Sequence, residues 1–198
     1  NFEGATNAAN QFLEQYAGTE YAYLVEPILI QGKLQIGKQA PTLTGKDVHG
    51  NQLSLESALG KVTYVVFWGF WWGPCVTAIP AEKALVERYK NRPFTIFGVN
   101  TDQEKDDYLE KCEKYGVTWN SIHDPYGNKN GPTKKWGVRG FPTSYLIDHK
   151  GVIRYRDLGK KELDQRVAEL VAEAEELSKS EKQADPFGYQ CQDCLSRL

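Results

Sequence analysis

The chain has no methionine among its 198 residues, and it has only four cysteines. Because it begins at Asn1, we expect either a processed form whose targeting segment has been removed or a shortened chain. Four cysteines are too few to hold together a disulfide scaffold of this length. The composition therefore excludes a small disulfide-rich fold and leaves the cellular compartment open.

Two further absences narrow the function classes. No apolar run is long enough to cross a bilayer, so the sequence predicts no transmembrane segment. The 24 lysines and arginines are balanced by 26 aspartates and glutamates, which gives a formal net charge of -2. This balance leaves no basic excess that would draw the chain to nucleic acid or to an anionic membrane.

What the sequence does contain is an alternation of strand and helix patterns, with 40% hydrophobic residues. In order, we predict a helix at 5–16, a strand at 62–68, a helix at 74–90, a strand at 94–99, a helix at 103–115, a short helix near 134–136, strands at 143–147 and 152–155, and a helix at 163–177. Short strands are also expected in the glycine-rich stretch before residue 62. This order predicts an α/β fold with a mixed central sheet and helices on both faces.

The same pattern divides the chain into three parts. We expect an N-terminal helical extension over residues 1–34, the α/β domain over 35–180 and a flexible tail over 181–198. The tail is polar and is interrupted by Pro186 and Gly188.

The tail carries a second pair of cysteines, Cys191 and Cys194, in C-x-x-C spacing. They do not form a c-type haem site, because Leu195 follows where that motif needs histidine. They supply at most half of a tetrahedral zinc site, and no second pair completes it. A small disulfide loop, a second redox pair and two idle thiols all stay open. We predict no cofactor and no metal site.

The stretch from Phe67 to Pro80, FWGFWWGPCVTAIP, has the frame of a C-x-x-C motif at a helix start. The attacking species in disulfide exchange is a thiolate, and a helix N-terminus lowers the pKa of a cysteine placed there. The first sulfur of the motif attacks, and the second releases the product. Here Trp72 stands at the first position and only Cys75 is present, so one dithiol cycle cannot be completed.

Three blocks of the sequence resemble the thioredoxin-like TlpA/ResA family of thiol-disulfide oxidoreductases, which are relatives of the AhpC/TSA redoxins. GKVTYVVFWGFWWGPCVTAIP resembles the active-site strand and helix of that family, IGKQAPTLTGKDVHG its first segment, and WGVRGFPTSYLIDHKG its cis-proline loop, with Pro142 in the proline position. The resemblance spans about residues 35 to 178 and implies a thioredoxin-like fold. It also implies an exported protein with an ancestral activity of thiol-disulfide exchange on protein disulfides.

Two positions depart from the family pattern. Trp72 replaces the attacking cysteine, and Ala78 stands where many relatives carry a glutamate that helps to move protons. We therefore expect dithiol exchange to be impaired or lost. As an enzyme, the protein would use Cys75 as a catalytic monothiol, or the tail pair Cys191 and Cys194. The competing interpretation of Cys75 is a small buried hydrophobic residue.

The alternative function is a non-catalytic protein-binding module. Trp71, Trp72 and Phe141, together with Phe70, would form an aromatic rim that grips a protein partner. The backbone before Pro142 would pair with an extended segment of that partner, as an added strand does. The competing interpretation of Trp72 is a plug that fills the former active site. The sequence leaves the partner and the oligomeric state open.

The remaining candidates carry no chemistry of their own. Cys112 shares a helix face with Tyr108 and Tyr115, so we expect a core cysteine. We expect its helix to lie across the sheet from the helix of Cys75, which would prevent a disulfide between the two. Three histidines fall in predicted turns and are expected to be solvated: His49, His123 and His149.

Overall fold

The computed structural model describes residues 2–19, 21 and 24–184. Cys191 and Cys194 lie outside the described residues, together with the rest of the expected tail from residue 185 onward. The three interpretations of that pair therefore stay predictions.

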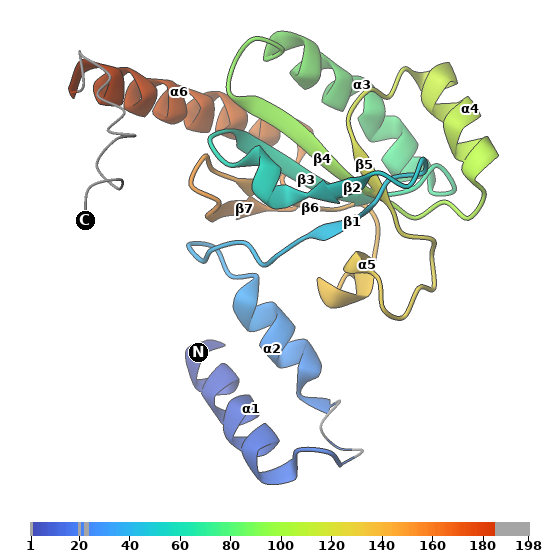
Figure 1. Ribbon diagram of the computed structural model, residues 1–198, viewed down its shortest axis with the longest axis vertical. Coiled ribbons are helices and arrows are strands. Elements are labelled where there is room, and N and C mark those ends of the chain that lie inside the picture. Colours follow the sequence, from blue (N-terminus) through green and yellow to red (C-terminus); the bar gives the residue numbers. More distant parts are fainter. Residues whose placement is uncertain (1, 20, 22–23, 185–198) are drawn as a thin grey trace, which may run out of the picture.

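The described chain is built from six α-helices, seven strands and a 3-10 helix, and their order is shown in Figure 1. The elements are α1 (Phe2–Tyr16), α2 (Glu26–Lys33), β1 (Thr44–Lys46), β2 (Gln52–Ser54), η2 (Leu55–Ala58), β3 (Val62–Trp68), α3 (Gly73–Arg88), β4 (Phe94–Asn100), α4 (Lys105–Tyr115), β5 (Ser121–His123), α5 (Pro132–Lys135), β6 (Thr143–Ile147), β7 (Ile153–Arg156) and α6 (Lys160–Ala184).

The central sheet has five strands in the order β5-β4-β3-β6-β7. β3 pairs in parallel with β4, and β4 with β5, whereas β6 runs antiparallel to both β3 and β7. The predicted mixed sheet is thus confirmed. Every residue of β3 is buried, as a continuous apolar run in a central strand requires.

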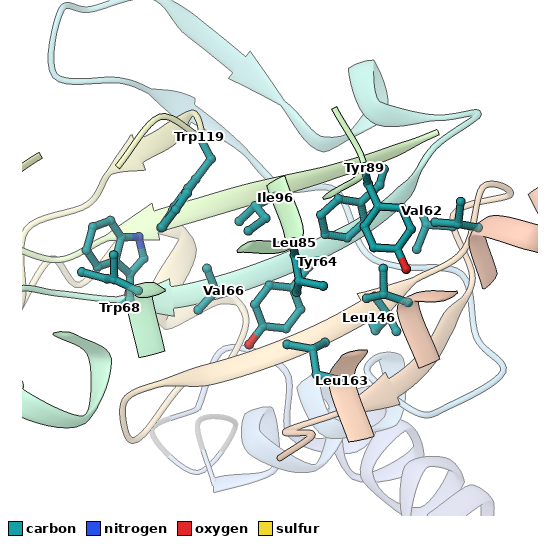
Figure 2. Packing of buried hydrophobic residues seen from close by; sticks show 14 of the residues in the cluster. Val62, Tyr64, Val66, Trp68, Leu85, Tyr89, Ile96, Trp119, Leu146 and Leu163 are labelled. Atoms are coloured by element: carbon teal, nitrogen blue, oxygen red, sulfur yellow. The ribbon is translucent and has the colours of Figure 1, made fainter. Parts of the chain in front are cut away.

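Helices and loops cover both faces of this sheet. On one face, α3, α4 and α6 pack over Val62, Tyr64, Val66 and Trp68 of β3. Figure 2 shows part of this cluster, with Trp68 beside Trp119 at one end and Val62 at the other. The other face carries the alternate β3 residues together with a second set from the loops and short elements: Leu34, Leu43, Trp136, Tyr145 and Ile153.

The prediction that α4 lies across the sheet from α3 is wrong. Residues of both helices, including Cys75 and Cys112, pack in or against the same cluster. The strands β3, β4 and β5 are added in one direction across the sheet, and a right-handed connection then puts both helices on the same face. Cys75 and Cys112 are both free thiols in this structure.

The N-terminal extension consists of two helices that pack on each other, and Figure 1 shows them on the side of the sheet where α5 lies. Ala9 of α1 is buried at this contact. A side chain at Gly32 of α2 would come within 2.6 Å of the Thr6 hydroxyl, so glycine allows the close approach. Only α1 was predicted; α2 is the second helix of the pair, and Ile30 in its middle packs against the second face of the sheet.

Two other segments differ from the sequence-based expectation. Residues 121–123 form the edge strand β5, so His123 lies in a strand and not in a turn. His49 and His149 do lie in turns, and His49 is exposed as expected. The expectation that His149 is solvated is wrong, because both of its ring nitrogens are buried. α6 extends to Ala184, past the expected start of the tail at residue 181, because lysine, glutamate, glutamine and alanine are good helix formers.

Candidate functional site

The candidate site lies where β3 ends and α3 begins, at the carboxyl end of the parallel strands. Trp72 is the residue before the first helical position, with an extended backbone at φ -115° and ψ 112°. Cys75 follows within the first turn of the helix. The motif therefore has the strand-turn-helix setting that the sequence predicts.

A polar segment after β4 holds this turn in place. The Asp102 carboxylate accepts the backbone N–H of Phe70 at 2.9 Å and the side-chain amide of Asn100 at 2.6 Å. The Trp71 indole N–H donates to the Thr101 hydroxyl at 3.1 Å. Sequence reasoning missed these residues, although the run Asn-Thr-Asp directly after a buried strand was a usable signal.

Cys75 is enclosed by the protein and is not accessible at the surface. Only 2% of the residue is exposed. Burial raises the pKa of the Cys75 thiol to about 11, a hydrogen bond with the Gly69 backbone opposes the rise, and the carboxylates of Glu82 and Asp102 add to it. The helix start favours a thiolate, but the loss of water outweighs that effect here.

An aromatic patch surrounds the start of α3, and we define it as Trp71, Trp72, Tyr126 and Phe141. The Trp71 ring lies 5.9 Å from the Trp72 ring and 5.4 Å from both the Tyr126 and the Phe141 rings, between centroids. The Trp72 residue is 43% exposed, so it does not seal the former site as a plug would. The patch is thus an apolar surface in which Phe141 makes edge-to-face contacts with Trp71 and Tyr126.

The aromatic patch differs from the predicted rim at two residues. Phe70 does not belong to it, because it is 7% exposed and packs into the core against Trp68 and Tyr115. Tyr126, which is 62% exposed, was missed. Its backbone carbonyl accepts the Gln103 side-chain amide at 2.7 Å, and this bond ties the loop to the segment after β4.

The loop before β6 brings Pro142 next to this patch. The peptide bond between Phe141 and Pro142 is cis. Within the described part of the chain, the backbone N–H groups of Arg139, Gly140 and Phe141 have no hydrogen-bond acceptor. Unpaired backbone donors beside an apolar surface are the features by which a sheet edge pairs with an extended peptide.

On the other side of Pro142 lies a cavity of about 260 Å³. Pro74 and Ala78 of α3 form one wall, and Pro142 forms part of the other. Glu82, one turn after Ala78, also lines the cavity and is 5% exposed. Burial raises the pKa of the Glu82 carboxyl to about 7.

Glu82 is the functional candidate that the sequence analysis passed over. It follows Cys75 by seven residues and Ile79 by three, so all three share one helix face. An acidic residue at a position of the helix that faces the core was the available signal.

The structure thus brings together Trp71, Trp72, Phe141 and Pro142, and it buries Cys75 beneath them. Ala78 lies one turn further along α3, half-buried at the cavity wall. Among the residues that the structure describes, no group of three or more histidine, cysteine or acidic side chains could hold a metal ion.

Comparison with known proteins identifies relatives over the same region. The sequence model of the AhpC/TSA family matches residues 36–156. The chain is 32% identical over 140 residues to the thioredoxin-like protein YneN of Bacillus subtilis, covering 68% of this chain and 79% of YneN. It is 31% identical over 133 residues to the thiol-disulfide oxidoreductase ResA of Bacillus thuringiensis, covering 67% of this chain and 75% of ResA.

Solved structures agree with this assignment. The thioredoxin domain of a thiol-disulfide oxidoreductase from Bacteroides vulgatus has a TM-score of 0.63 at 29% identity, covering 69% of this chain and 98% of that domain. A crystal structure described as a putative thiol:disulfide interchange protein DsbE from Chlorobium tepidum has a TM-score of 0.62 at 27% identity, over 69% and 98% of the two chains. In the described residues, no helix has the length and apolar character needed to span a membrane. The chain therefore belongs to the AhpC/TSA family and has the thioredoxin-like fold of the thiol-disulfide oxidoreductases.

Proposed function

We propose that this protein has lost the dithiol exchange of its family and binds an extended protein segment through the aromatic patch and the Pro142 loop. The observation that carries the proposal is the state of the two motif positions. Trp72, at the position that we assign to the attacking cysteine, is exposed, whereas Cys75 is 2% exposed. An exposed aromatic side chain that can bind a partner thus stands where the family has a reactive thiol.

The chemistry of Cys75 supports the first half. With a pKa of about 11, roughly one Cys75 in ten thousand is a thiolate at pH 7. Cys112, the other described thiol, lies on α4 and is also free. Monothiol chemistry at Cys75 would first need the helix start to open, so we favour a structural role for this residue.

The geometry of the rim supports the second half. Trp72 offers a large apolar area with one N–H donor, which suits an anchor at the centre of an interface. The unpaired N–H groups of Arg139, Gly140 and Phe141 can pair with the backbone of an extended segment that crosses the patch. The ligand class is a protein segment, and no sulfur in that segment is required.

A disulfide reduction assay with insulin tests the loss of exchange. We expect the unmodified protein to reduce insulin at the background rate, and the Trp72→Cys variant to gain measurable activity, because Gly73, Pro74 and Cys75 keep the frame of the motif. The Trp72→Ser variant introduces a side chain similar in size to cysteine but without a thiol, so it should stay inactive. Activity of the unmodified chain that Cys75→Ser abolishes would establish monothiol chemistry instead, and activity that survives it would place the chemistry in the tail pair.

Peptide binding tests the second half. An array of overlapping unstructured peptides selects a binder, which is then titrated by calorimetry. We expect Trp72→Ala to weaken binding by about 1–4 kcal/mol, the range for an interface anchor, without unfolding the domain. Leu59→Ala is the matched control, because Leu59 is an exposed apolar residue that precedes β3, at the opposite end of that strand. Equal effects of the two variants would contradict the assignment.

The compartment belongs to the same proposal. We infer export from the family resemblance. Cell fractionation of the source organism checks it, and accumulation with the cytoplasmic proteins would contradict it.

A further inference from the structure

The cavity beside Pro142 contains an acidic group that the fold does not use. Glu82 is 5% exposed, and within the described residues its carboxylate has no hydrogen-bond donor and no ion-pair partner. A buried carboxylate without a partner is unfavourable, because it loses its water and gains nothing in return. An unpaired Glu82 carboxylate therefore indicates a ligand that pairs with it.

The walls of the cavity are mostly apolar. They are formed by small and aliphatic side chains from α3, the Pro142 loop and α6, and the phenol of Tyr64 lies among them: Tyr64, Pro74, Ala78, Ala81, Pro142, Leu158 and Leu163. The volume of about 260 Å³ is several times the share of about 30 Å³ that one water occupies in the liquid. An aliphatic stem fits such walls, and a charged end group fits the carboxylate.

We propose that this cavity receives a basic side chain, that of lysine or arginine, from the extended segment bound across the aromatic patch, and that Glu82 pairs with its cation. The inference rests on the proposed binding function and names the chemistry of the partner. Pro74 and Pro142 line the cavity. Pro74 is two residues after Trp72 and Pro142 directly follows Phe141, so one segment can reach both places.

The other charged groups at the cavity leave Glu82 available. Asp157 is already engaged, since its carboxylate accepts the Ser144 backbone N–H at 2.8 Å and the Arg156 guanidinium at 3.0 Å. Lys160 also lines the cavity but is exposed, and it forms no ion pair with Glu82. Because Lys160 stays in water, its repulsion of an incoming cation is screened.

The proposal has a defined pH dependence. Tyr64 and Cys75 face Glu82 from the core as neutral groups, and Asp157 and Lys160 face it from the loop and from α6. With a pKa of about 7, Glu82 is half protonated in the empty protein at neutral pH. A bound cation holds it ionised, so affinity for a basic segment should rise about tenfold between roughly pH 6 and pH 8.

The first test uses the n-butylammonium ion, the end of a lysine side chain, on the full protein. We expect saturable NMR shifts of the Ala78 and Ala81 methyl groups in the unmodified protein, and no saturation in Glu82→Gln. Butanol at the same concentration should give neither. Equal shifts with butanol, or shifts that persist in Glu82→Gln, would reduce the cavity to an apolar hollow and overturn the proposal.

The second test uses the peptide selected from the array in two forms, one with lysine and one with norleucine at the basic position. The lysine form should bind about tenfold more tightly at pH 8, a value typical of a charged hydrogen bond, and Glu82→Gln should remove the difference. The Lys160→Gln variant should keep or increase the difference in affinity between the two peptides. Should Glu82→Gln fail to fold, Ala78→Leu, which fills the cavity from one wall, should weaken the lysine form.

The outcomes separate this inference from the proposed function. Peptides that depend on Trp72 but show no preference for basic residues would leave the binding function intact and overturn the pocket. Butylammonium binding at Glu82, with no peptide effect of Trp72→Ala, would support the pocket and overturn the binding function.

Discussion

At the scale of single residues, burial decides the chemistry of this site. Cys75 stands at a helix start, where a thiolate is favoured, yet its enclosure raises its pKa to about 11. Glu82, on the same helix face, has a pKa raised to about 7 by the same loss of water. Both groups are therefore held mostly or partly in their neutral forms at physiological pH.

The raised pKa of Glu82 predicts how stability depends on pH. The folded state keeps the proton up to about pH 7, whereas the unfolded chain releases it near pH 4.5. The free energy of unfolding should therefore fall as pH rises through this window, by about 3 kcal/mol in total. Glu82→Gln should flatten this slope and be the more stable form at pH 8. Urea unfolding at pH 5 and pH 8 measures the free energy of unfolding of both forms. The same pH dependence in Glu82→Gln as in the unmodified protein would contradict the assignment.

At the scale of elements, the turn between β3 and α3 depends on the segment after β4. Glycine at position 69 lets the Trp71 indole lie against this turn, because a side chain there would come within 2.4 Å of the indole nitrogen and displace the ring. Asp102 then anchors the turn through the Phe70 backbone N–H. The position of the aromatic patch follows from these contacts and not from the helix alone.

Removing this anchor should destabilise the domain. Asp102→Ala leaves the Phe70 N–H buried without an acceptor, and we expect a loss of about 1–3 kcal/mol in the free energy of unfolding. Asp107→Ala is the matched control, because it removes an exposed ion pair with Lys111, worth about 0.3–0.5 kcal/mol, and one acidic charge in the first turn of α4, worth about 0.3–1 kcal/mol, but no buried hydrogen bond. Urea denaturation compares the two variants, and losses of equal size would show that the anchor is dispensable.

At the scale of the whole molecule, the two described thiols differ in exposure, and we expect the two tail cysteines to differ from both. Cys75 is enclosed, and Cys112 is half-buried, with burial raising the pKa of its thiol as well. Cys191 and Cys194 lie outside the described residues, and nothing in the pattern of their sequence predicts that they are buried.

Reactivity should follow these differences. In the reduced protein, brief treatment with iodoacetamide should modify Cys191 and Cys194 first, Cys112 later and Cys75 last. Mass spectrometry of the digested protein gives the order. Preferential labelling of Cys112 would contradict both the tail prediction and the assignment of that residue to the core.

The sequence alone determined the features that depend on neighbours along the chain. β3 was predicted with its correct ends, because a central strand buried on both faces is a continuous apolar run. β6 was also predicted with its correct ends, because the turn residues 148–151 separate it from the next strand. The family follows from local motifs, such as the spacing of Gly73, Pro74 and Cys75. The three-residue strand β5 was missed, since so short an edge strand has no period to detect.

Only the tertiary structure decided what depends on residues far apart. Tyr126 joins Trp71 from a loop more than fifty residues away, and no local pattern marks it. The shared side of α3 and α4 follows from the direction in which strands are added and the handedness of their connections. The enclosure of Cys75 and Glu82 follows from the packing of α3, α4 and α6 over one face of the sheet. A pKa depends on the water that surrounds a group, and the fold alone decides which groups lose that water.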